Sequence, residues 1–276
     1  MPITSDWGEW LPRTVESASP DGLALWYLGC NGFVCKSSSG ATVFVDPYLG
    51  TGDPPRTVRM IPVPFDPADV AEADAVLATH EHTDHVHGPS QAPILAGTDA
   101  DFFAPDASVR KAREAGWTET WDLEPSHLNR VSEGDTFEIR DLTITVRPAN
   151  DPDAEHPVGY LIEHQAGTFF HGGDARPGAF EPTGEAYDID LGALAFGSTG
   201  RILDKETRRP ARTTWYNDET QVVEAAGELQ LDRLLPTHWD MWKGLTADPT
   251  ALHDHVRSFA HPERLEIVEI GDRVDL

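Results

Sequence analysis

The most informative part of this chain is the stretch Thr79-His80-Glu81-His82-Thr83-Asp84-His85. It follows an apolar segment at residues 75–79 that we expect to be a buried strand. Three imidazoles and a carboxylate on one short loop can converge on a point, and they are ligand types that divalent transition metals prefer. The stretch is not a His-Glu-x-x-His zinc site, because Asp84 stands where the second histidine would be. It therefore predicts a metal centre at a strand end.

Strand and helix signals extend on both sides of this loop. Short apolar runs between turn residues predict strands at residues 23–28, 33–36, 41–45, 75–79, 93–96, 136–140, 142–147, 158–163, 168–171, 191–196, 233–236 and 265–270. Longer runs predict helices at residues 107–115, 218–229 and 249–259, and the proline-rich residues 50–67 predict a surface loop. Two mixed sheets with helices outside them would accommodate this order in one domain, residues 1–276.

Charge and composition limit the classes of partner. The chain has 276 residues, with 21 Lys+Arg against 47 Asp+Glu, and its formal net charge is −26. This charge repels phosphate backbones, so we expect no nucleic acid partner. The start of the chain has no leader-like segment and no window approaches 18 apolar residues, so we expect a cytoplasmic protein without a membrane partner. Cys30 and Cys35 could pair across a hairpin, but we favour two buried, unpaired thiols.

The acidic balance is similar to that of proteins from salt-loving organisms. In molar salt the Debye length falls to about 3 Å, so repulsion between surface carboxylates is largely screened. We therefore expect the melting temperature to fall when the protein is moved from molar to physiological salt. Thermal melts followed by circular dichroism in the two buffers check this expectation. A melting temperature that does not fall would show that a saline habitat does not explain the acidity.

Three residues beyond the loop extend the metal-binding pattern. His156 precedes an expected strand, Asp174 follows residues 168–171, and His238 follows residues 233–236. A His-x-His-x-Asp-His motif followed by a distant His, an Asp and a last His, each at a strand end, is typical of the metallo-β-lactamase superfamily, which this chain resembles. The resemblance implies an α+β fold, a four-layer αββα sandwich in which two sheets pack face to face between helices.

The same resemblance implies roles for these residues around two divalent cations. The first metal would be held by His80, His82 and His156, and the second by Asp84, His85 and His238. Asp174 would bridge the two cations and, with Asp84, take part in catalysis. Two cations about 3.5–4 Å apart lower the pKa of a shared water, so that a bridging hydroxide can attack a carbonyl or phosphoryl group. Asp46 corresponds to an acidic family position that would hydrogen-bond a ligand histidine, although Asp-Pro is also a common turn.

Local phrases narrow the resemblance to the L-ascorbate-6-phosphate lactonase subgroup. They lie at residues 26–29, 45–49, 60–67, 79–85 and 237–244. This resemblance implies Mn²⁺ or Zn²⁺ as the metal. It also implies a small lactone or ester substrate, either phosphorylated or neutral, and it is compatible with a homo-oligomer. The candidate substrate-binding side chains, each with an ordinary surface or core role as its alternative, are Arg56, Arg59, Arg176, Trp239, Trp242, Lys243 and Tyr48.

Other functions of this fold remain as alternatives. A phosphodiesterase or nuclease of the superfamily would usually have a basic groove and a further nucleic-acid-binding domain. A non-hydrolytic diiron redox protein would typically have a glutamate where His82 stands, together with an electron-carrier domain. A degenerate scaffold would lack ligands, whereas this chain has a candidate for all seven. Metal analysis combined with lactone and phosphodiester substrates would separate these functions.

Overall fold

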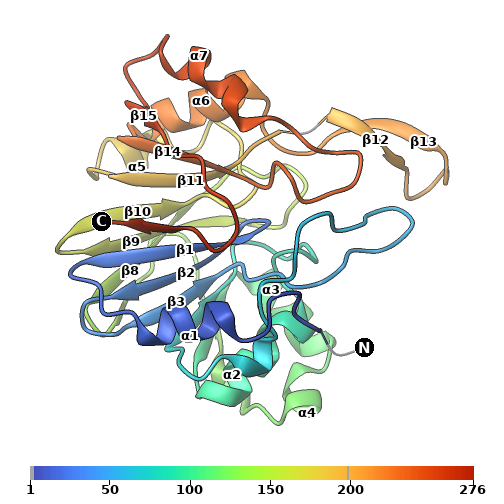
Figure 1. The fold of residues 1–276 in the computed structure, drawn as a ribbon, viewed down its shortest axis with the longest axis vertical. Coiled ribbons are helices and arrows are strands. Elements are labelled where there is room, and N and C mark those ends of the chain that lie inside the picture. Colours follow the sequence, from blue (N-terminus) through green and yellow to red (C-terminus); the bar gives the residue numbers. More distant parts are fainter. Residues whose placement is uncertain (1–2, 198) are drawn as a thin grey trace.

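Two seven-stranded mixed sheets form the centre of the molecule (Figure 1). The computed structural model describes residues 3–197 and 199–276. The first sheet has the order β16-β1-β2-β3-β4-β5-β6. Its strands are β1 (Leu23–Gly29), β2 (Gly32–Ser37), β3 (Thr42–Val45), β4 (Ala75–Leu77), β5 (Asp101–Ala104), β6 (Leu128–Arg130) and β16 (Arg273–Asp275).

The second sheet also has seven strands, in the order β15-β14-β11-β10-β9-β8-β7. Its strands are β7 (Thr136–Ile139), β8 (Leu142–Pro148), β9 (Val158–His164), β10 (Gly167–His171), β11 (Leu191–Ala195), β14 (Arg233–Thr237) and β15 (Arg264–Leu265). The inner faces of the two sheets share one apolar cluster, in which the rings of Phe33 on β2 and Phe169 on β10 have centroids 5.4 Å apart. The sheets therefore pack face to face.

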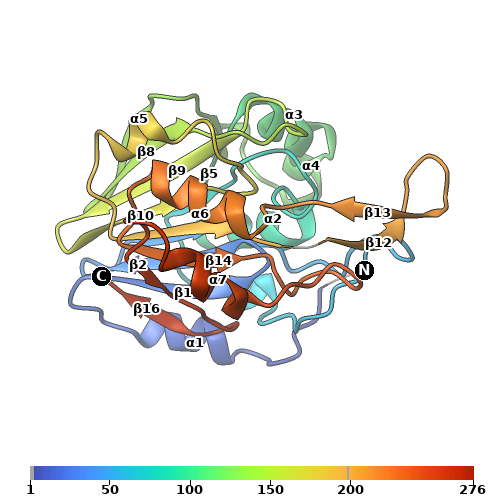
Figure 2. The ribbon, with the colours of Figure 1, turned by 90° about the horizontal axis from the view of Figure 1, so that it is seen from above.

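Helices cover the outer face of each sheet, as Figures 1 and 2 show from two directions. The first sheet is covered by α1 (Trp10–Ser17), α2 (Gly88–Thr98), α3 (Asp106–Glu114) and α4 (Trp117–Trp121). The second is covered by α5 (Glu181–Gly184), α6 (Glu219–Glu228) and α7 (Leu252–Val256). Asp218 caps α6, where its side chain accepts hydrogen bonds from the backbone of Thr220 and Gln221. These layers confirm the predicted four-layer αββα sandwich.

Two predicted strands are wrong, and each has a physical reason. Residues 93–96 lie within α2, because a short buried apolar run does not distinguish helix from strand and Pro93 weakens the helical signal. Of residues 265–270, only Leu265 belongs to a strand, β15. The chain then leaves the second sheet, turns at Gly271, where φ is +87°, and joins β1 of the first sheet as β16. The predicted helix at 249–259 is shortened to a 3₁₀ turn at Pro249–Ala251 followed by α7.

Strand direction brings the candidate ligands to one edge of each sheet. β3 and β4 are parallel, β10, β11 and β14 are parallel, and β8 runs in the same direction as β10 because both are antiparallel to β9. Polar side chains follow the carboxyl ends of these strands, where ligands of such sheets commonly bind. They are Asp46 after β3, residues 79–85 after β4, Asp151 after β8, Asp174 after β10 and His238 after β14.

A third, two-stranded sheet projects from the body of the molecule. It consists of β12 (Thr199–Leu203) and β13 (Pro210–Thr214), and Figure 2 shows it extending to one side. None of the helices in the described part of the chain is long and apolar enough to cross a membrane.

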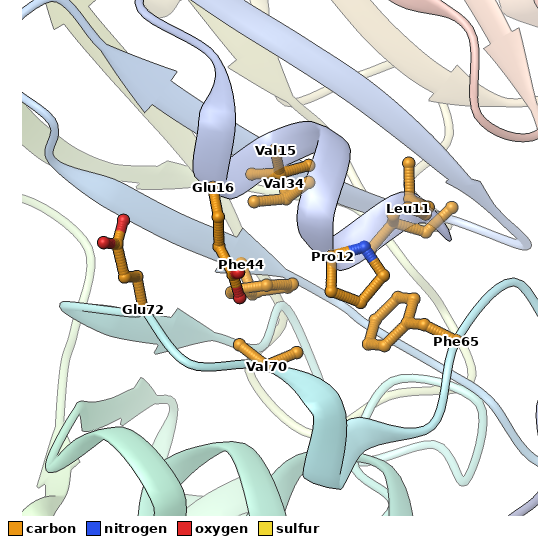
Figure 3. Close-up of a pocket in the computed structure, with 10 residues that line it drawn as sticks. Leu11, Pro12, Val15, Glu16, Val34, Phe44, Phe65, Val70 and Glu72 are labelled. Carbon is orange, nitrogen blue, oxygen red and sulfur yellow. The ribbon is translucent and has the colours of Figure 1, made fainter. Parts of the chain in front are cut away.

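A small cavity lies beneath α1, on the outer side of the first sheet (Figure 3). Apolar side chains such as Val15, Phe44 and Phe65 line most of it, and Glu16 and Glu72 also contribute. Its volume is about 10 Å³ for a water-sized sphere, which is room for about one water molecule. It is too small for a substrate, so the strand ends are the place to look for a functional site.

Candidate metal centre

Asp46 fixes the start of the histidine-rich loop. Its Oδ1 accepts a hydrogen bond from the backbone N–H of Thr79 at 2.9 Å, and its Oδ2 accepts one from the Thr79 hydroxyl at 2.7 Å. Oδ2 also lies 2.8 Å from Nδ1 of His85. Burial alone would raise the pKa of Asp46, but His85 and His171 outweigh it and lower that pKa. Because Asp46 is ionised, it favours a proton on Nδ1 of His85, which leaves Nε2 as the atom that could bind a cation.

A first group of side chains gathers around His80. Its Nε2 lies 3.0 Å from Nδ1 of His82, 3.5 Å from Oδ2 of Asp151 and 3.9 Å from Oδ2 of Asp174. His80 is buried, and this burial, together with the nearby His85, lowers the pKa of His80 to about 3. A neutral imidazole is the form that binds a metal.

Asp151, rather than His156, lies beside His80 and His82 in the structure. His156 is exposed on the loop between β8 and β9. The close groups of possible ligand atoms in the described part of the chain include neither His156 nor Asp151, but Oδ2 of Asp151 lies 3.5 Å from Nε2 of His80 and 3.8 Å from Nδ1 of His82. Asp151 stands earlier on that loop, three residues after the end of β8, and its side chain is only 7% exposed. The Asp151 carboxylate faces His80 and His82 because it stands close to the end of β8, which lies at the site. The residues after Asp151 run towards the surface, where His156 is exposed.

A second group surrounds His238. Nε2 of His238 lies 3.3 Å from Oδ2 of Asp84 and 3.8 Å from Oδ1 of Asp174, and Nε2 of His85 lies 3.3 Å from the same Oδ1. Burial would lower the pKa of His238 and of His85, but neighbouring acidic groups, Asp174 among them, raise both well above the usual range. These carboxylates attract positive charge, and a cation bound at Nε2 would replace the proton there. The same attractions lower the pKa of Asp84 and of Asp174, so both carboxylates are ionised.

Asp174 lies between the two groups. Its Oδ2 faces His80, and its Oδ1 faces His85 and His238. Oδ1 also accepts a hydrogen bond from the side-chain amide N–H of the buried Asn31 at 2.9 Å. The side-chain Oδ1 of Asn31 accepts one from the hydroxyl of Thr237, just before His238. Asn31 thus fixes the orientation of the carboxylate relative to the second group.

Gly173 lets the end of β10 approach the histidine-rich loop. Its φ is +58°, and a Cβ at this position would lie 2.7 Å from the Thr79 hydroxyl oxygen. Since that hydroxyl holds Asp46, a larger residue here would displace the loop or the Asp174 backbone.

Two buried polar atoms without hydrogen-bond partners lie where cations could bind. Nε2 of His85 and Oδ2 of Asp151 are buried, and neither has a hydrogen-bond partner. Unpaired buried polar atoms are costly, and both of these atoms face other potential ligands. Burial and the nearby Asp174 carboxylate also raise the pKa of Asp151, a repulsion that a cation between the two carboxylates would remove. The imidazole and carboxylate set therefore fits divalent metals.

The four basic candidates for substrate binding differ in what they contact. The guanidinium of Arg59 donates to the backbone oxygens of Ile61, Tyr48, Gly50 and Pro62, so it braces the proline-rich loop and has few hydrogens left for a substrate. Arg176 donates to the Trp215 backbone, and Arg56 stacks over the Trp215 ring. Lys243 is exposed on the loop that follows His238.

The aromatic candidates are partly structural. Trp242 is 3% exposed, and its indole N–H donates to the Tyr216 hydroxyl at 3.1 Å. The Tyr216 ring in turn stacks on His238, with centroids 4.0 Å apart. Tyr48 is also buried and packs against Trp242, while Trp239 is half-buried and its indole nitrogen has no hydrogen-bond partner.

Comparisons with known proteins identify the family. A family model described as the beta-lactamase superfamily domain matches residues 41–239. The chain is 27% identical to a probable L-ascorbate-6-phosphate lactonase from Escherichia fergusonii, over 88% of this chain and 77% of that protein.

Solved structures show the same fold. The novel metallo hydrolase Igni18 from the archaeon Ignicoccus hospitalis superposes with a TM-score of 0.66, at 21% identity over 91% of this chain and 97% of that one. CmlA, a diiron beta-hydroxylase from Streptomyces venezuelae, superposes with a TM-score of 0.65, at 18% identity over 94% of this chain and 55% of that one. With its motif, fold and family match taken together, the chain belongs to the metallo-β-lactamase superfamily.

Proposed function

We propose that this protein is a hydrolase with two divalent cations that opens a lactone or an ester of a small molecule. The observation that carries the proposal is the position of Asp174, one oxygen of which faces the His80 group and the other the His85 and His238 group. A bridging carboxylate needs this arrangement to contact two cations at once. In this proposal His80, His82 and Asp151 hold one cation, and Asp84, His85 and His238 hold the other.

Bound divalent cations would supply Lewis acidity and an activated water at neutral pH. The chain itself supplies orientation. Asp46 keeps the proton of His85 on Nδ1, and Asn31 holds the Asp174 carboxylate in place. Side chains of the second group differ in access to solvent, since Asp84 is 17% exposed while His85 and His238 are fully buried. A substrate would therefore reach this group from the side of Asp84, and it would reach the first group at His82, which is 37% exposed.

The name of the Escherichia relative supports a lactone as the substrate class and a phosphate as its anionic group. We therefore assign Lys243 as a candidate contact for that anion, because it is exposed and lies five residues after His238. Arg176 and Arg56 are further candidates, since Nε of each is buried without a hydrogen-bond partner. Zn²⁺ and Mn²⁺ both suit imidazole and carboxylate ligands.

Replacing Lys243 with alanine tests the anion contact. Loss of a charge-assisted hydrogen bond removes about 1.5–3 kcal/mol, so KM for a phosphorylated substrate should rise roughly ten- to a hundredfold. Steady-state kinetics with a phosphorylated lactone and its neutral analogue measure this, with metal content determined in parallel. Lys205→Ala, at an exposed lysine of the projecting hairpin loop, is the matched control. An equal loss for both substrates would make Lys243 structural and direct the search to Arg176 and Arg56.

The reaction class is tested with the protein loaded with zinc or with manganese. Phosphorylated lactones, neutral lactones, carboxylic esters and phosphodiesters are offered in molar and in physiological salt. We expect turnover of a lactone or an ester and none of the phosphodiesters. Phosphodiester cleavage alone would favour the phosphodiesterase alternative, and bound iron without any hydrolysis would favour the redox alternative.

A further inference from the structure

A buried cysteine lies beside the second group of ligands. Sγ of Cys30 is 3.3 Å from Nε2 of His238, and potential ligand atoms of Cys30, Asp84 and His238 all lie within 4.8 Å of one another. From these distances we propose that the Cys30 thiolate is a further protein ligand of the cation held by Asp84 and His238. The inference rests on the proposed metal centre and adds a sulfur ligand to it.

The distances agree with a shared coordination sphere. Neighbouring nitrogen, oxygen and sulfur ligands 2.0–2.3 Å from one ion lie about 3–3.6 Å apart. The His238 Nε2 atom is 3.3 Å from both the Cys30 sulfur and Oδ2 of Asp84. Nε2 of His85 supports a cation here independently, because it is fully buried, lacks a hydrogen-bond partner and points at Oδ1 of Asp174.

The backbone holds Cys30 in this position. Its carbonyl oxygen accepts hydrogen bonds from the backbone N–H of His238 and from the Tyr27 hydroxyl, both at 2.9 Å. Cys30 and His238 also adopt φ angles of +58° and +66°, a conformation that costs most residues energy and is concentrated at functional sites. Two strained residues joined by a backbone hydrogen bond keep the sulfur and the imidazole together.

Cys30 lies in buried, largely apolar surroundings, where a thiolate is unfavourable unless a cation binds it. Cys30 is 0% exposed and packs with Tyr48, Tyr216 and Trp242 in one apolar cluster. Such a cluster excludes water from one side of the site and leaves the sulfur facing His238. Thiolate ligands favour zinc over manganese, so Cys30 would bias the second site towards zinc.

Cobalt(II) substitution tests the ligand directly, because a thiolate bound to cobalt gives an intense near-ultraviolet charge-transfer band. Wild type, Cys30→Ser, Cys30→Ala and Cys35→Ser are loaded with cobalt, and metal content and absorption are measured together. Cys35 is the matched control, since it is equally buried on the same hairpin but lies between the two sheets, away from the ligand groups. We expect the band in wild type and in Cys35→Ser and its loss in both Cys30 variants.

Zinc X-ray absorption on the wild type provides a second measurement that needs no variant. A sulfur shell at about 2.3 Å is expected beside the nitrogen and oxygen shell. When zinc and manganese compete for the site, the ratio of zinc affinity to manganese affinity should fall by about tenfold or more in Cys30→Ser. About tenfold is the smallest loss of affinity typical of changes around a metal ligand.

The outcomes separate this inference from the proposed function. Two bound cobalt ions without a thiolate band in the wild type, or a band that persists in Cys30→Ser, would overturn the role of Cys30 and leave the centre intact. Failure of the wild type to bind cobalt or zinc would overturn the metal centre itself.

Discussion

Replacing Asp174 with alanine is expected to abolish hydrolysis and to release at least one cation. The carboxylate faces both ligand groups, so its loss removes a ligand from each at once. Mutation of a residue that only hydrogen-bonds to a metal ligand typically costs up to about a hundredfold in activity. Because Asp174→Ala removes the ligand itself, the fall in turnover should exceed about a hundredfold. Turnover and metal content measured on the same preparation check this.

Asp174→Asn separates lost chemistry from lost folding. Asparagine keeps the shape of the side chain and a carbonyl oxygen that can accept from Asn31, but it removes the charge. We expect it to lose activity and metal while its circular dichroism spectrum matches that of the wild type. Either variant retaining both cations and a near-normal rate would remove Asp174 from the bridging role.

The second large effect concerns the loop between β8 and β9. Asp151→Ala should reduce the affinity of the first site for its cation by more than about tenfold, because the side chain lies among His80 and His82. His156→Ala should leave metal content and turnover unchanged, since His156 is exposed whereas Asp151 lies 3.5 Å from His80. Titration with zinc in the presence of a competing chelator measures both variants.

Asp153→Asn is the matched control for Asp151→Ala. Asp153 lies two residues further on the same loop and is exposed. It should behave as the wild type. If His156→Ala released metal and Asp151→Ala did not, the loop would bind the cation through the histidine, as the family pattern implied.

The sequence was sufficient for the order of layers but not for every element. Buried strands such as β1 and β9 are continuous apolar runs with turn residues at their ends, so their positions follow from local signals. The hairpin β12–β13 is mostly exposed and polar, so it has no apolar pattern to detect. The passage from β15 to β16 depends on both sheets being present, which no local window contains.

The candidate metal ligands differ in the same way in how far the sequence predicts them. The histidine-rich loop is contiguous and follows a strand, so spacing alone identifies it. Asp151 was not among the predicted ligands, because the family pattern has a histidine at this point. The signal available was a carboxylate four residues after the strand expected at residues 142–147. Cys30 reads locally as an ordinary buried residue, and its proximity to His238 joins positions 208 residues apart in the chain. Only the packing of the two sheets brings them together.

We propose that two cations lie on either side of Asp174, and anomalous X-ray diffraction from crystals loaded with zinc or manganese would locate them. We expect two anomalous peaks about 3.5–4 Å apart, with Asp174 between them. One peak should lie among His80, His82 and Asp151, and the other in the His85 and His238 group. A single peak, or peaks away from Asp174, would contradict this proposal.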